Sequence, residues 1–197
     1  MKTPKPVSWK TALVLLFLVA LWLRWPYPEP AWTHIDEQRA FLEYPLGILG
    51  GDLNPHFFNY PSLQLYLTAA FYYLHYLVSS YETLDGFVAY YYLVDPSALL
   101  LAPRGLTSLM SAATVVVLFF LSRRLYGSAR SGLCAGAVLA TMPLHVRFSH
   151  LAATDIPMTL WVSLAMLAAV RIAQDQQHAD YLWAGLFTGL AGSTKYP

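Results

Sequence analysis

Two adjacent carboxylates and an arginine stand together in the segment His34-Ile-Asp-Glu-Gln-Arg39. The segment follows the first apolar stretch of the chain, so we expect it just beyond the outer end of a membrane-spanning helix. Ionisable groups beside hydrocarbon are costly and mark functional sites by default. A carboxylate at a water-poor boundary is suited to proton abstraction, which makes Asp36 a candidate general base or a carboxylate that orients a donor. The structural alternative is that Asp36 caps a helix and Glu37 is a solvated acid in its first turn.

Arginines near this pair are candidates for binding a phosphate. The planar fork of Arg39 suits a phosphate, but Arg39 also stands four residues before Glu43, with which it would form an ordinary surface pair. Arg104 opens a later apolar stretch, directly after Ala102-Pro103. It either contributes to a site or extends its charged end to the membrane interface. Both alternatives stay open for each arginine.

A third group of polar residues occurs in the segment Arg147-Phe-Ser-His-Leu-Ala-Ala-Thr-Asp-Ile-Pro157. Asp155 either caps the helix that begins at Ile156-Pro157 or contributes to a site. Arg147 and His150 are further candidates on this loop. One histidine and one carboxylate do not by themselves define a metal site. The sequence therefore leaves open whether a divalent metal binds here.

The composition favours lipid as the main solvent. Of the 197 residues 57% are hydrophobic and 12% charged, with a mean hydropathy of +0.44, whereas soluble domains carry roughly 25% charged residues. The net charge of +1 and the absence of a basic tract argue against a nucleic-acid partner. We therefore expect an all-α, polytopic membrane protein.

Five segments are long and apolar enough to cross a bilayer, at about 9–25, 99–121, 132–148, 156–172 and 181–196. A sixth, 60–79, is ambiguous. If it does not cross, seven Lys and Arg residues lie inside and four outside; if it crosses, the counts are five and six. Because Lys and Arg prefer cytoplasmic loops, the first arrangement is favoured, with a cytoplasmic N-terminus.

In this topology residues 26–98 form a long outer loop with interfacial helices. The first is expected from Asp36 to Leu49 and ends at Gly50-Gly51, a turn follows at 52–56, and 60–79 lies at the membrane surface. Nine of the eleven acidic residues then face outward, together with the candidate site residues.

In their order and sidedness these residues resemble the GT-C membrane glycosyltransferases, in the branch of the protein O-mannosyltransferases and the aminoarabinose transferases of lipid A. Asp36-Glu37-Gln38-Arg39 matches the branch's acidic pattern, and Gly51 to His56 with Tyr60-Pro61 looks like its next loop. One departure is Tyr60, where the aminoarabinose transferases carry a lysine; this makes lipid A a less favoured acceptor.

The resemblance implies that sugar is moved from a polyprenyl-phosphate donor to an acceptor hydroxyl on a protein, glycolipid or polysaccharide, at the extracytoplasmic face of the plasma membrane. It implies that Asp36 deprotonates the acceptor and that Glu37 supports Asp36 or contacts the sugar. It also implies that Arg39 and Arg104 hold the donor phosphate and that Asp155 helps to shape the acceptor or metal side of the site. Residues 1–197 would be one membrane-embedded module at the N-terminal end of a longer protein. A secondary transporter and a non-catalytic membrane scaffold are the alternatives.

Overall fold

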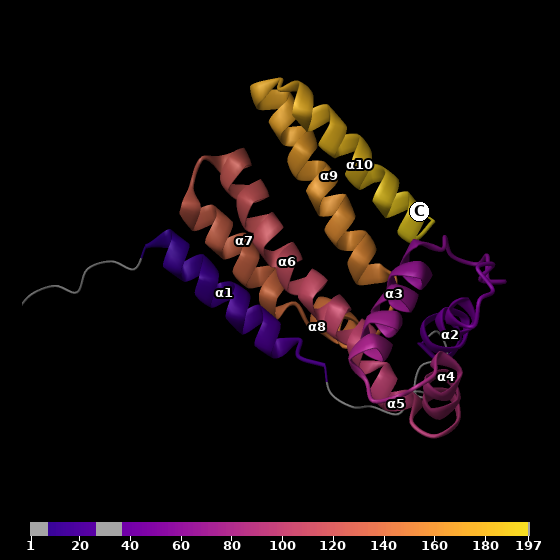
Figure 1. Ribbon diagram of the computed structural model, residues 1–197. Helices are drawn as coiled ribbons and strands as arrows, with labels where there is room; N and C mark the ends of the chain where they lie inside the picture. Colours follow the sequence, from indigo (N-terminus) through magenta and orange to yellow (C-terminus); the bar gives the residue numbers. More distant parts are fainter. Residues whose placement is uncertain (1–7, 27–36, 197) are drawn as a thin grey trace, which may run out of the picture.

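The computed structural model describes residues 8–26 and 37–196, and within these ranges the chain forms helices and loops without a strand (Figure 1). This confirms the all-helical expectation. Helices α1 (Trp9–Leu23), α6 (Leu101–Tyr126) and α7 (Ala129–Thr141) lie side by side, and α9 (Asp155–Asp175) and α10 (His178–Thr194) form a hairpin next to α6. The helices of the long loop gather at one end of this bundle.

Tight turns at helix ends produce the antiparallel arrangement. Helix α6 ends at Tyr126 because Gly127 adopts a left-handed conformation, with φ 65°. The hydroxyl of Ser128 then accepts a hydrogen bond from the backbone N–H of Arg130 and caps α7. Helix α9 ends in the same way at Gln176, with φ 52°, before α10 begins.

Two of the described helical stretches are long and apolar enough to cross a membrane. They are Pro96–Tyr126, which joins the short helix α5 (Pro96–Leu99) to α6, and Asp155–Asp175; Trp9–Leu23 is a shorter apolar helix. The count of five spans is not confirmed and stays a prediction.

The expected continuous helix at 132–148 is divided into α7 and α8 (Pro143–Ser149). Met142 between them is extended, with ψ 115°, because a residue before proline avoids the helical region. Hydropathy alone does not register this break.

Glycine allows α7 to approach α6 closely. A Cβ atom on Gly132 would lie 2.7 Å from the backbone oxygen of Phe119, and one on Gly136 would lie 2.9 Å from the side chain of Leu16. The second glycine pair of the sequence, Gly185 and Gly189, lies on the exposed face of α10 with no atom within 4 Å of an added Cβ. Close helix packing therefore holds for the first pair only.

The expected helix after Asp36 is a π-helical stretch, η2 (Glu37–Glu43), followed by α2 (Tyr44–Leu49). Pro45 has no N–H to donate to the carbonyl of Phe41 four residues earlier. The hydroxyl of Tyr72, from α3 (Leu63–Val78), donates to this carbonyl instead, at 2.7 Å. The helix ends where the glycines predicted it to end, and Gly51 has φ 100°. The capping role expected of Asp36 lies outside the described residues.

The long loop has its own apolar core. Phe87, from α4 (Leu84–Leu93), is fully buried with Phe41 and Tyr72, and Ala152 from the loop before α9 joins the same cluster. The two predicted outer loops are thus packed into one layer over the end of the helical bundle.

Candidate functional site

A buried ion pair fixes the acidic segment to the bundle. Arg104 Nε donates to Glu37 Oε1 at 2.9 Å, and Arg104 Nη2 donates to Oε2 at 2.7 Å. Glu37 Oε1 also accepts a hydrogen bond from the backbone N–H of Ala152, at 2.6 Å. The Glu37 and Arg104 side chains are 0% and 1% exposed. One carboxylate therefore joins the start of η2, the first turn of α6 and the loop before α9.

Tyr72 lies close to this ion pair. Burial, and then the negative charge of Glu37, raises the pKa of the Tyr72 phenol well above its ordinary value. Tyr72 therefore stays a neutral donor to the Phe41 carbonyl at every physiological pH and does not add a negative charge beside Glu37.

A second ion pair closes the neighbouring edge of the same layer. Lys195 Nζ lies 2.6 Å from Asp155 Oδ1 and 5.6 Å from the ring centroid of Tyr60. The two charged side chains are 28% and 45% exposed, respectively, so this pair is in contact with solvent. The end of α10, the start of α9 and the loop before α3 meet here.

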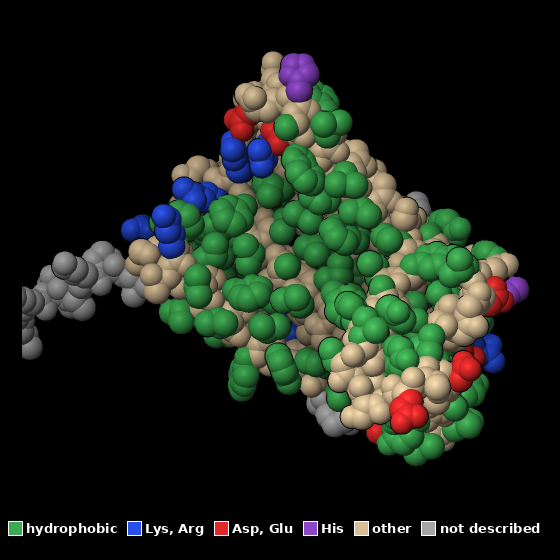
Figure 2. All heavy atoms as spheres, in the orientation of Figure 1, with side chains coloured by type: hydrophobic (Ala, Val, Ile, Leu, Met, Phe, Trp, Pro, Cys, Tyr) green, Lys and Arg blue, Asp and Glu red, His purple; other side chains and the backbone are tan. Residues whose placement is uncertain are grey.

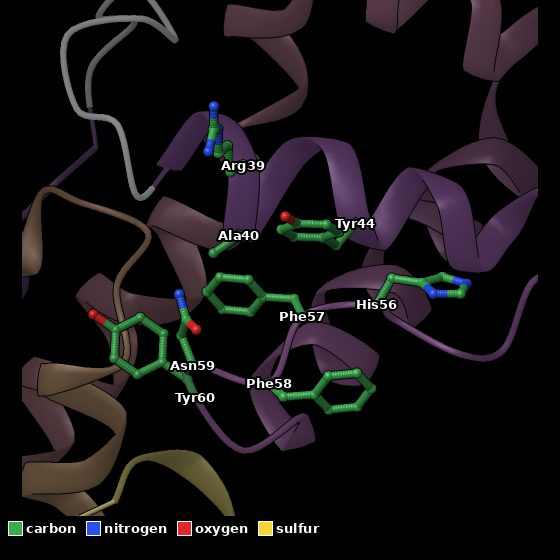
Figure 3. Close-up of a pocket in the computed structure, with 8 residues that line it drawn as sticks. All are labelled: Arg39, Ala40, Tyr44, His56, Phe57, Phe58, Asn59 and Tyr60. Carbon is green, nitrogen blue, oxygen red and sulfur yellow. The ribbon is translucent and has the colours of Figure 1, made fainter.

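An open cavity of about 440 Å³ lies between η2 and the loop before α3 (Figure 3). Its lining residues are Arg39, Ala40, Tyr44, His56, Phe57, Phe58, Asn59 and Tyr60. The Phe57 ring stacks on Tyr44, with centroids 4.9 Å apart, and meets Tyr60 edge-on. Arg39 is exposed on η2, and Asn59 lies with Tyr60 on the facing loop. The cavity combines aromatic walls with a few polar groups, as small-molecule sites do.

The loop along this cavity is shaped by side chains that bond to its own backbone. Asp52 accepts from the N–H of Asn54, and Asn54 accepts from the N–H of His56, at 3.0 and 3.1 Å. His56 has φ 49°, an uncommon conformation for a residue other than glycine, and its Nε2 lies 2.8 Å from Asp52 Oδ2. Hydrogen bonds from His56 and Asn54 lower the pKa of the Asp52 carboxyl. The expected turn at 52–56 is confirmed.

Arg24 is a buried residue whose role the sequence reading missed. Its guanidinium donates to the carbonyls of Ala20, Leu139 and Ala140 and to the Ser111 hydroxyl, and it lies 3.2 Å from His145 Nδ1. The carbonyls of Leu139 and Ala140 belong to the last turn of α7, where the helical N–H donors run out. Arg24 therefore caps α7 and ties it to α1 and α6. Its position at the outer end of a predicted span, where positive charge is disfavoured, was the available signal.

The remaining predicted site residues are spread around this layer. Arg147 is exposed on α8, and His150 follows that helix with a half-buried side chain. Asp36 lies outside the described residues. Within the described part of the chain, no three His, Cys, Asp or Glu side chains come together in a way that could hold a metal ion.

Residues 100–197 match the model of the dolichyl-phosphate-mannose-protein mannosyltransferase family. This segment includes Arg104, Asp155 and Lys195. Neither a curated protein nor a solved structure matches the chain.

Proposed function

We propose that the chain, whose residues 100–197 match this mannosyltransferase family, moves a sugar from a polyprenyl-phosphate donor to an acceptor hydroxyl at the extracytoplasmic membrane surface. The observation that carries the proposal is the meeting of four segments at one end of the bundle. Glu37, Arg104 and Ala152 are bonded together there, and Asp155 and Lys195 pair beside the cavity that Arg39 lines.

In this proposal the donor phosphate contacts Arg39 and Lys195. Arg39 is exposed at the cavity, and Lys195 lies over Tyr60, which also lines it. An ammonium group has three donors, and Asp155 occupies one of them. Cations at these two places would stabilise the phosphate as it leaves, in a setting where headgroups replace bulk water.

The resemblance implied that Arg104 contacts the donor phosphate. In this proposal Arg104 has a different role. Both of its bonds to Glu37 are fully buried, and a phosphate could bind it only by displacing that carboxylate. We assign Arg104 as a positioning residue that holds Glu37, and through Glu37 the start of η2, in place.

Asp36 is the proposed general base. It directly precedes Glu37, whose carboxylate accepts three hydrogen bonds and fixes this point of the chain. Asp36 would take the proton of the acceptor hydroxyl while the acceptor oxygen attacks the anomeric carbon. The carbon–phosphate oxygen bond breaks in the same step, and polyprenyl phosphate leaves with the electron pair.

Replacing Arg39 with glutamine tests the cavity as the donor site. A hydrogen bond to a charged group contributes about 1.5–3 kcal/mol, so we expect kcat/KM for the donor to fall roughly 10- to 150-fold. The measurement is transfer of labelled mannose from a polyprenyl-phosphate donor by the full-length protein in vesicles. The matched control is Arg130→Gln, which removes an exposed arginine at the other end of the bundle and should retain wild-type transfer. Equal donor kinetics for both variants would remove the cavity from the donor site.

A further inference from the structure

The basic and the acidic side chains gather mainly at opposite ends of the molecule. Figure 2 shows Lys and Arg gathered where α6 and α9 end and α1 and α7 begin, and carboxylates gathered at the far end, around the long loop. The basic end carries Lys10, Arg123, Arg124, Arg130 and Arg171, against Asp175 and Asp180. Between the ends, the face seen in Figure 2 is largely apolar.

Both carboxylates of the basic end are already paired. Arg124 lies 2.9 Å from Asp175, and Arg171 lies 2.9 Å from Asp180, whose side chain is 1% exposed. No carboxylate in the described part of the chain therefore neutralises the positive charge that remains at this end.

Arg123 is held by an aromatic ring instead of by a carboxylate. Its guanidinium carbon lies 4.3 Å from the ring centroid of Trp9, and the ammonium of Lys10 lies 5.7 Å from the same ring. Across residues 8–26 and 37–196, no carboxylate lies within ion-pair distance of Arg123 or Lys10. Stacking orients the guanidinium but leaves its hydrogen-bond donors without an anion.

A cavity of about 500 Å³ opens beside these cations, lined by Phe120, Arg123, Arg124, Gly127 and Gln174. Its lining residues come from the C-terminal part of α6, from Gly127 directly after it and from the last turn of α9. Arg124 is fixed on its wall, because Gln174 Nε2 donates to the Arg124 carbonyl at 3.1 Å and Asp175 pairs with its guanidinium. The cavity thus has two arginines on a wall that is held by hydrogen bonds.

The apolar neighbours of the cavity distinguish a lipid from a soluble anion. Phe120 is 38% exposed one turn before the arginines, and Leu125 and Tyr126 are 53% and 73% exposed directly after them. A phosphate at Arg123 would therefore have exposed apolar surface on both sides, which suits acyl chains. Arginines at a helix C-terminus also stabilise the helix dipole, but that role requires neither the cavity nor the stacking on Trp9.

We propose that this cavity binds the phosphodiester headgroup of an anionic phospholipid in the adjacent leaflet. Basic pockets between membrane helices bind such headgroups, and each Lys or Arg near the surface contributes about 1 kcal/mol. The site lies about 28 Å along α6 from Arg104, given 1.5 Å per helical residue. It does not depend on the transferase function, and its lipid would anchor the ends of α6 and α9 while the far end binds donor and acceptor.

The test is lipid binding to the purified full-length protein in a zwitterionic detergent, measured by native mass spectrometry. The probes are dioctanoyl phosphatidylglycerol, dioctanoyl phosphatidylcholine and inorganic phosphate. We expect phosphatidylglycerol to bind more tightly than phosphatidylcholine, and inorganic phosphate at the same concentration not to displace it. Arg123→Gln should weaken phosphatidylglycerol binding roughly five-fold, the change that corresponds to one basic residue.

Arg147→Gln, which removes an exposed arginine of α8 at the opposite end, is the matched control and should leave phosphatidylglycerol binding unchanged. Equal affinity for the two lipids, or equal loss in both variants, would overturn the proposal. Displacement of the lipid by inorganic phosphate would also overturn it, because the cavity would then be a site for a soluble anion. Circular dichroism of both variants checks that they are folded.

Discussion

Asp36→Asn is expected to lower sugar transfer by about 10²- to 10⁴-fold, the range that a general base contributes. Asparagine keeps the size of the side chain but cannot accept the proton of the acceptor hydroxyl. Since Glu37 still pairs with Arg104, we expect the variant to insert into membranes and fold as the wild type does. The measurement is transfer from a polyprenyl-phosphate sugar by equal amounts of purified full-length protein in vesicles, with donor and acceptor saturating.

The matched control for this variant is Asp85→Asn. Asp85 is an exposed carboxylate in the first turn of α4, within the same long loop. We expect its transfer rate to equal that of the wild type. If Asp36→Asn also transferred sugar at the wild-type rate, Asp36 would have no catalytic part and the scaffold alternative would gain support.

Arg104→Met is expected to destabilise the folded chain by about 3–5 kcal/mol, because it leaves the carboxylate of Glu37 buried without its cation. The free energy of unfolding, measured in mixed detergent micelles, reports this loss. Arg124→Met is the comparison, since it removes one side of an ion pair that is 42% and 36% exposed. An exposed pair contributes about 0–1 kcal/mol, so this variant should be nearly neutral.

The double variant Glu37→Leu with Arg104→Met separates pairing from burial. Replacing both charges by apolar side chains removes the unpaired carboxylate, so part of the lost stability should return. Recovery should be incomplete because the N–H of Ala152 loses its acceptor. If Arg104→Met cost no more than Arg124→Met, Glu37 and Arg104 would not be the buried pair described above.

Local features of the fold were predictable from the sequence because they depend on residues that are close together in the chain. Gly50-Gly51 predicted the end of α2, and the Asp, Asn and Pro residues at 52–56 predicted the turn. The break at Pro143 had a local signal too. Hydropathy outweighed it, since apolar residues continue on both sides of the proline.

Partners far apart in the sequence were not predictable in the same way. The expected sidedness of positive charge marked Arg104 as unusual. It did not indicate that the partner of Arg104 would be Glu37, 67 positions earlier. The position of Arg24 at the end of α1 gave a similar hint. Its role, however, depends on carbonyls that are available as hydrogen-bond acceptors only because α7 ends at Thr141. Lys195 gained a defined place only when α10 brought it to Asp155 and Tyr60.

The proposed function requires that the cavity and the two ion pairs face the compartment outside the cytoplasm, with the basic end facing inward. Labelling of single cysteines by a membrane-impermeant maleimide in intact cells tests this directly. Asp85→Cys marks the cavity end and His178→Cys the basic end, each in a Cys134→Ser background that removes the native cysteine. We predict that the cysteine at 85 is labelled in intact cells and that the cysteine at 178 is labelled only after permeabilisation. The reverse pattern, or labelling of both positions from the same side, would contradict the account.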